Sequence, residues 1–246
     1  MVSIKDCDPK AVTCISATKA LYEYMAKSKD GPEVLNIALH GNPWRFYDQD
    51  MRILEVEEAA ELIRPMLGKR VRRVDLVASW SGVAPDTQSQ SLAWKLSEAL
   101  RGFPVEGKEG FLWINSKGQL RTTRQAFTLM KGGKPYSVAQ GDEVMISLAG
   151  GWPATMEDFF VRERDAKGIL RAGSGWDIFP LCPERALQAY EAAAKLSHPV
   201  AAYNAALLRL ERGETGDREA AVILLKQAAD AGDKKARTRL GKLGRL

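Results

Sequence analysis

The chain has 246 residues, of which 45% are hydrophobic and 27% charged, and its formal net charge is +5. This composition is typical of a globular protein and excludes collagen-like, low-complexity and disordered classes for the bulk of the chain. Six basic residues lie in the last 14 positions beside one acidic residue, Asp233, and the rest of the chain holds equal numbers of acidic and basic residues. Because the body of the chain is neutral, the charge does not indicate a nucleic-acid binder.

Residues 1–30 form an N-terminal segment without the apolar core of a signal peptide. No stretch of the sequence reaches the run of about 18 apolar residues that a membrane span needs. If the protein is exported, we expect the sequence to begin after a removed signal. Cys7 and Cys14 bracket six residues and would close as a local disulfide in an oxidising compartment, whereas two reduced cysteines are the alternative.

Short apolar strands alternate with amphipathic helices through the next part of the chain. Strands are predicted over residues 34–39 and 74–79, with helices over residues 56–67 and 92–100 after them. Residues 111–114 are predicted as a strand that enters a hairpin, and residues 143–148 as a last strand. This order predicts an α/β domain over residues 31–180, with a mostly parallel sheet and helices on both of its faces.

Two glycine-rich stretches, residues 149–153 and 172–177, each carry a tryptophan. They are predicted as irregular loops with a short helix, residues 156–164, between them. Four tryptophans, Trp44, Trp80, Trp152 and Trp176, then fall in loops, whereas Trp94 and Trp113 are expected in the core.

Residues 181–246 are rich in Ala and Leu and are predicted to be a small, all-α domain of helix pairs. A shift of 35 residues superposes Ala186 on Ala221, Tyr190 on Leu225 and Ala201 on Ala236. Small residues at fixed positions let paired helices approach closely, and each pair must stack on a neighbour to bury its apolar face.

This segment resembles the Sel-one-like repeats, which are related to the tetratricopeptide repeats. The resemblance is carried by residues 201–208, Gly213, Asp217 and the stretch Lys226–Ala229, and it covers about one and a half repeats. Ala206 and Leu225 depart from the usual glycine and aromatic residue. The resemblance implies a module that binds other proteins.

The ends of the first two predicted strands carry a candidate catalytic pair. His40-Gly41 follows one strand, and Ser79, followed by Ser81-Gly82, ends the next. The arrangement resembles the caspase-like cysteine peptidases, in which the position of Ser79 holds the nucleophilic cysteine. Because a serine needs a stronger base arrangement than a thiolate, the resemblance implies a domain that has lost catalysis. A turn histidine and a strand-capping serine are the structural alternatives.

The sequence holds no other catalytic or cofactor motif. It has no glycine-rich nucleotide loop, and its two histidines, His40 and His198, do not have the spacing of a zinc site. We therefore predict no cofactor and no metal.

Two sets of residues are candidates for contact with a protein partner. One consists of the loop tryptophans Trp80, Trp152 and Trp176, because tryptophan is enriched at binding hot spots. The other consists of Lys235, Arg239 and Lys242 on one face of the last helix. The structural alternatives are a tryptophan lid over the core and a solvated helix face.

The combination of a degenerate hydrolase-like domain with interaction repeats resembles immunity proteins of the type VI secretion system. The resemblance implies a protein that docks on a secreted phospholipase-type effector and blocks its access to substrate. Protection against such an effector is needed in the periplasm, and the cytoplasm is the alternative location. A serine-variant hydrolase using Ser79 and His40 and an envelope or signalling adaptor are the alternative functions.

Overall fold

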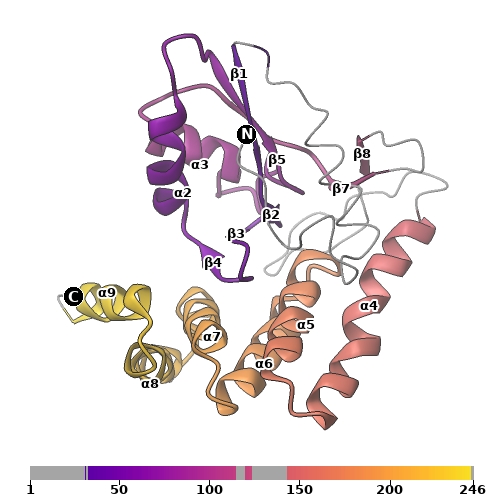
Figure 1. Ribbon diagram of the computed structural model, residues 1–246, viewed down its shortest axis with the longest axis vertical. Coiled ribbons are helices and arrows are strands. Elements are labelled where there is room, and N and C mark those ends of the chain that lie inside the picture. The colour runs from indigo at the N-terminus through magenta and orange to yellow at the C-terminus, as the bar shows by residue number, and fades with distance from the viewer. Residues whose placement is uncertain (1–30, 32, 115–119, 124–142, 245–246) are drawn as a thin grey trace. The chain divides into compact units, whose positions relative to one another are not determined.

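A computed structural model describes residues 31, 33–114, 120–123 and 143–244, which fall into two compact units (Figure 1). The first unit takes its described residues from Met1–Gln49 and Leu54–Val144, and the second from Asp50–Ile53 and Met145–Leu246. The sequence pattern put the domain boundary at residue 180, whereas the structure separates the units at residues 144 and 145. The predicted segment 1–30 lies outside the described residues.

A three-stranded parallel sheet forms the centre of the first unit, in the order β1-β5-β6. Its strands are β1 (Val34–Ala38), β5 (Arg73–Val77) and β6 (Val105–Glu106), and Ala38 is the partner of Val77 at the end of the first pair. Both long strands are confirmed where the apolar runs predicted them. β6 was not predicted, because two residues are too few to show a pattern.

Two helices connect these strands. α2 (Val56–Ile63), followed by a 3-10 turn, η1 (Arg64–Met66), links β1 to β5, and α3 (Leu92–Ala99) links β5 to β6. Glu55 and Glu58 form a capping box at the start of α2, and the Ser91 hydroxyl caps α3 by accepting from the amide of Trp94. Both predicted helices are therefore confirmed, although α2 ends at Ile63 and not at residue 67.

Within the described residues both helices cover the same face of the sheet, so the prediction of helices on both faces is wrong for this part. The reason is that both crossovers run in the same direction along the sheet, and parallel crossovers have one hand. A single buried cluster contains sheet and helix residues, among them Leu35, Ile37, Val74, Leu76, Ile63 and Leu96.

The opposite face of the sheet contacts a hairpin. β7 (Phe111–Ile114) and β8 (Leu120–Thr123) pair antiparallel, as the sequence predicted for the first of them. Ala38 and Val77 at the strand ends pack against Leu112 and Leu120 of this hairpin. A second small sheet contains β2 (His40–Gly41), β3 (Phe46–Tyr47) and β4 (Ile53–Leu54), with β2 and β3 antiparallel.

The second unit is helical. Its helices are α4 (Glu143–Arg162), α5 (Ala166–Ile178), α6 (Pro183–Lys195), α7 (Pro199–Arg212), α8 (Asp217–Asp230) and α9 (Lys234–Leu243), and from α5 onward each packs on the next. The predicted strand over residues 143–148 is wrong, because these residues begin α4. The irregular loops predicted over residues 149–153 and 172–177 are also wrong, because these residues belong to α4 and α5, whereas most of the short helix predicted over residues 156–164 lies within α4.

Glycines misled the prediction because they serve helix packing here. A Cβ atom on Gly173 would lie 2.7 Å from the ring of Tyr190, and one on Gly175 would lie 2.9 Å from the ring of Trp152. Both glycines are inside α5, so they let aromatic side chains of α6 and α4 approach its backbone. The same residues that indicate a flexible loop in sequence indicate a close helix contact in the structure.

The helix pairs α6–α7 and α8–α9 repeat. α7 begins at Pro199 and α9 at Lys234, 35 residues later. Equivalent positions are buried in both pairs: Ala186 and Ala221, Tyr190 and Leu225, Ala193 and Ala228, Ala201 and Ala236. Each pair also turns through a left-handed residue, Ser197 with φ 63° and Gly232 with φ 91°. The structure thus has the predicted period, while membership of the Sel-one-like family stays a prediction.

Candidate functional site

The two predicted catalytic residues lie at neighbouring strand ends, which we call the strand edge. His40 follows the end of β1 by two residues and Ser79 follows the end of β5 by two, and the last residues of these strands are paired. His40 is not in a loop, however, since it belongs to β2 and pairs with Tyr47. The topological part of the prediction is therefore confirmed, and its local part is wrong.

The serines of the strand edge hold the chain to the segment that follows β6. The Ser79 hydroxyl accepts a hydrogen bond of 3.0 Å from the amide of Leu112 in β7. The buried Ser81 hydroxyl donates to the carbonyl of Ala78 (2.8 Å) and accepts from the amide of Lys108 (3.0 Å). Both hydroxyls thus satisfy backbone groups, a structural use of serine.

Gly82 also contacts the segment that follows β6. A Cβ atom on Gly82 would lie 2.9 Å from the carbonyl carbon of Gly107, so two backbones touch at this place. The Gly82 amide donates to the carbonyl of Lys108 over 2.9 Å. The Ser-Gly pattern that resembles a catalytic loop therefore also matches the requirements of backbone packing. Asp75, which the sequence did not place within reach of His40, forms an ion pair with Lys108.

The predicted partner-binding tryptophans divide into three cases. Trp80 is fully buried and has φ 62°, so it presents no surface to a partner. Trp152 is 40% exposed, but it lies on α4 and not in a loop. Trp176 lies on α5, where its ring nitrogen donates to Glu157 over 2.9 Å and Arg185 stacks 4.8 Å from its ring. In contrast, Trp94, expected in the core, is 49% exposed.

The basic residues of the last helix are partly engaged. Lys235 and Arg239 are half-buried and each has an interaction partner within the chain, whereas Lys242 is exposed. Ala236, on the opposite face of the same helix, is buried. The predicted disulfide between Cys7 and Cys14 lies outside the described residues.

A site that the sequence did not reveal lies in the second unit, where α7 and the start of α9 hold Met51–Ile53. We call it the arginine clasp and define it by Tyr203, Asn204 and Asp233. The Asn204 carboxamide donates to the carbonyl of Met51 (2.7 Å) and accepts from the amide of Ile53 (2.9 Å). Asn204 is fully buried.

The side chain of Arg52, which lies between these two backbone groups, contacts Asp233 and Tyr203. Arg52 donates to both carboxylate oxygens of Asp233, with 3.1 Å between Nη1 and Oδ1. Its guanidinium lies 4.6 Å from the centre of the Tyr203 ring. The ion pair is secluded, since 13% of the Arg52 side chain and 2% of the Asp233 side chain are exposed. A bidentate and stacked arrangement of this kind suits arginine and not lysine.

Asp233 occupies the helix-cap position of the second helix pair, which is equivalent to that of His198 in the first. Asp233 caps α9 by accepting from the amide of Ala236 (2.9 Å), as His198 caps α7 by accepting from the amide of Ala201 (3.4 Å). The two caps are 35 residues apart. Burial chiefly, and the charges of Lys167 and Arg52 in addition, lower the pKa of His198. Asn204 was the one available signal in the sequence, a polar residue inside an apolar helical run.

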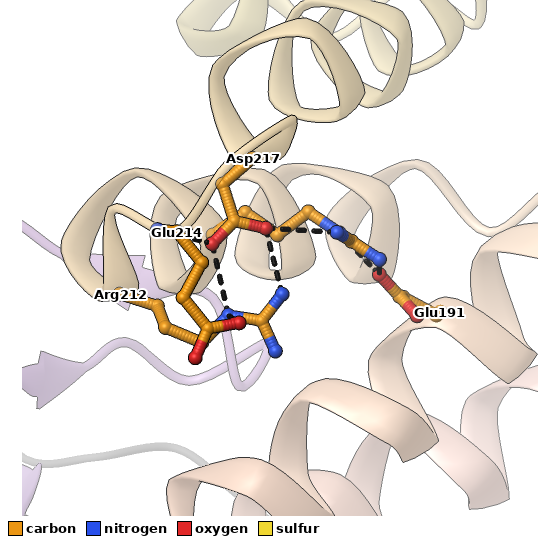
Figure 2. Close-up of polar contacts among 5 residues, drawn as sticks. Glu191, Arg212, Glu214 and Asp217 are labelled. Carbon is orange, nitrogen blue, oxygen red and sulfur yellow. Dashed lines mark hydrogen bonds and ion pairs between the residues drawn. The ribbon is translucent and has the colours of Figure 1, made fainter.

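A second polar network joins α7, which carries part of the clasp, to α6 and α8 (Figure 2). The buried Asp217 at the start of α8 accepts from Arg212 (2.7 and 2.9 Å) and Arg209 (2.9 Å), both near the end of α7. Arg209 also contacts Glu191 of α6. Hydrogen bonds from Arg212 hold the pKa of Asp217 well below its usual range, and those bonds raise the pKa of Arg212. Three helices are thereby joined through the carboxylates of Asp217 and Glu191.

Comparison with known proteins gives one similarity. Residues 10–122 match the model of a domain of unknown function (DUF8616), which is less than half of the chain and leaves α4–α9 outside. No curated protein and no solved structure matches the chain. No group of three or more His, Cys, Asp and Glu side chains suited to a metal occurs in the described part. Helices long and apolar enough to cross a membrane are likewise absent from that part.

Proposed function

We propose that this chain is a non-catalytic protein-binding protein whose helical unit is its interaction module. The observation that carries the proposal is the arginine clasp, in which buried side chains of α7 and α9 hold a short piece of polypeptide by its backbone and by one arginine. A surface that binds a segment of its own chain in this way has the chemistry needed to bind a segment of another protein.

The strand edge supports the non-catalytic part of the proposal. The Ser79 hydroxyl accepts from a strand amide, and its side chain is buried. A nucleophilic serine instead needs its hydroxyl hydrogen-bonded to a general base and exposed to a substrate. The use of Ser79 as a backbone anchor therefore favours a binding function.

The more specific form of the proposal follows the resemblance to immunity proteins. On this view the chain protects the periplasm by docking on a secreted phospholipase-type effector and blocking its substrate access. The test is to express an effector gene adjacent to this one, with export to the periplasm, alone and together with this chain. We expect growth to be restored and the two purified proteins to elute as one complex. Continued killing despite soluble expression of both proteins would contradict this role.

The serine hydrolase is the second candidate, because the topology does bring His40 and Ser79 to adjacent strand ends. A fluorophosphonate probe, which labels activated serines, distinguishes it from the binding protein. Our proposal expects no labelling at Ser79, with a known serine hydrolase as the positive control. Labelling that is lost in both Ser79→Ala and His40→Ala, with folding intact, would establish the hydrolase instead.

A further inference from the structure

The arginine clasp holds a segment that is remote from it in sequence. Asp50–Ile53 belongs to the second unit, although the chain on either side of it belongs to the first. Asn204 is 151 residues from Ile53, and Asp233 is 181 residues from Arg52. The helical unit thus binds four residues much as it would bind a separate peptide.

The backbone contacts select an extended conformation and not a sequence. In an extended segment the carbonyl before a residue and the amide after it point to the same side. Asn204 bonds to this pair of groups on either side of Arg52, as a neighbouring strand would. Because only backbone atoms are involved, this part of the site accepts any extended segment.

The side-chain contacts select arginine. The Asp233 carboxylate accepts two parallel hydrogen bonds from the Arg52 guanidinium. The guanidinium also lies over the face of the Tyr203 ring. Lysine cannot form the two parallel bonds, and its compact ammonium loses more hydration on burial. The two parts together select an extended segment with arginine at its centre.

The internal segment occupies the site at some conformational cost. Met51 has φ 57°, in the left-handed region that residues other than glycine, asparagine and aspartate disfavour. The segment must return to the first unit at Leu54, and a separate peptide has no such constraint. An external ligand can therefore match the contacts of residues 51–53 without this backbone conformation.

We propose that the arginine clasp is a peptide-binding site, that Met51–Ile53 is its intramolecular ligand, and that an extended segment with a central arginine on a partner protein takes its place. This inference rests on the proposed binding function, because it names the chemistry of the partner. It makes the internal segment a competitor that sets the affinity for the partner.

The test measures binding of a fluorescent peptide with the sequence of residues 48–55 to the full chain, by anisotropy. In the Arg52→Ala variant the internal ligand loses its side-chain contacts, so we expect this peptide to bind about tenfold tighter than to the unmodified chain. A peptide with lysine in place of the arginine should bind the variant about tenfold more weakly than the arginine peptide.

A double variant, Arg52→Ala with Asp233→Asn, is the matched control. Asparagine caps a helix as well as aspartate does, so α9 keeps its cap while the carboxylate is lost. We expect the preference for arginine over lysine to disappear in this variant. Melting curves of all variants report whether they fold, and Arg52→Lys, which keeps the positive charge, replaces Arg52→Ala if the latter unfolds.

The inference is overturned if a folded Arg52 variant binds the arginine and lysine peptides equally, or binds neither. The experiments distinguish failure of this inference from failure of the proposed function. Loss of peptide binding with effector protection intact removes the arginine clasp as the binding site and leaves the function. Selective peptide binding without effector protection leaves the clasp and removes the immunity role.

Discussion

The strand edge and the arginine clasp differ in how their sequences relate to their use. The strand edge carries a pattern that resembles a catalytic motif, yet Ser79, Ser81 and Gly82 hold backbone groups of the following segment. The clasp carries no recognisable motif, yet Asn204 and Asp233 bind a distant segment through four hydrogen bonds. Motif residues can thus serve the fold, while the contact with a distant segment is assembled from residues far apart in sequence.

The largest effect is expected from removing the buried amide of the clasp. Asn204→Ala leaves the Met51 carbonyl and the Ile53 amide without their partner, which should cost about 2–4 kcal/mol of stability. Urea unfolding measures the total loss, and hydrogen exchange at the Ile53 amide measures the local loss. We expect Ile53 to lose its protection.

A double-mutant cycle shows whether Asn204 acts on the segment. If it does, Asn204→Ala costs less in an Arg52→Ala background, with a coupling of at least about 0.5 kcal/mol. Additive losses would mean that the backbone and side-chain contacts are independent, which contradicts a single binding site.

The next effect concerns the choice of arginine. Arg52→Lys keeps the charge but loses the second hydrogen bond to Asp233 and the stacking on Tyr203, so we expect a loss of about 1–2 kcal/mol. Arg73→Lys is the matched control, because Arg73 and Glu106 form an ion pair whose side chains are 51% and 55% exposed. Exposed pairs contribute little, so this control should stay within about 0.5 kcal/mol of the unmodified chain. Equal losses in both variants would remove the case for a specific arginine site.

At the strand edge we expect a stability effect without a functional one. Ser79→Ala deprives the Leu112 amide of its acceptor and should cost about 1–2 kcal/mol. If the proposed function holds, Ser79→Ala should change neither protection against an effector nor peptide binding by the clasp. A variant that folds but loses protection would show that the strand edge, and not only the clasp, takes part in function.

The predictability of these regions follows from the range of the interactions. β1, β5, α2 and α3 were predicted, because apolar periodicity is a local signal. Of α4 only the part after residue 156 was predicted, and α5 was not, because Gly173 and Gly175 indicate turns locally, whereas in α5 they leave room for the rings of Tyr190 and Trp152. A long-range contact here overrides the local preference.

Of the two candidate sites, the strand edge was predictable from the sequence and the arginine clasp was not. Adjacent strand ends follow from topology, so the proximity of His40 and Ser79 was predictable. The clasp joins residues 52 and 233, and no single-sequence pattern connects positions so far apart. The polar Asn204 within an apolar run was the only visible trace, since a fully buried amide requires partners.

The smallest effect concerns pH and the cap equivalent to Asp233. The folded pKa of His198 is lowered, chiefly by burial and further by Lys167 and Arg52, against a weaker opposing effect of Asp165. The unfolded chain, with a pKa of about 6.5, therefore takes up the proton first, so stability is complete above that pH and falls as the pH drops toward the folded pKa. His198→Asn keeps a cap but cannot titrate, so its melting temperature should fall less between pH 7.5 and 5.5.

The Arg52→Met variant tests the charge contribution to the pKa of His198. One of the nearby positive charges is gone in this variant, so we expect its melting temperature to depend less on pH than that of the unmodified chain. An unchanged pH dependence in Arg52→Met would show that the guanidinium does not act on His198.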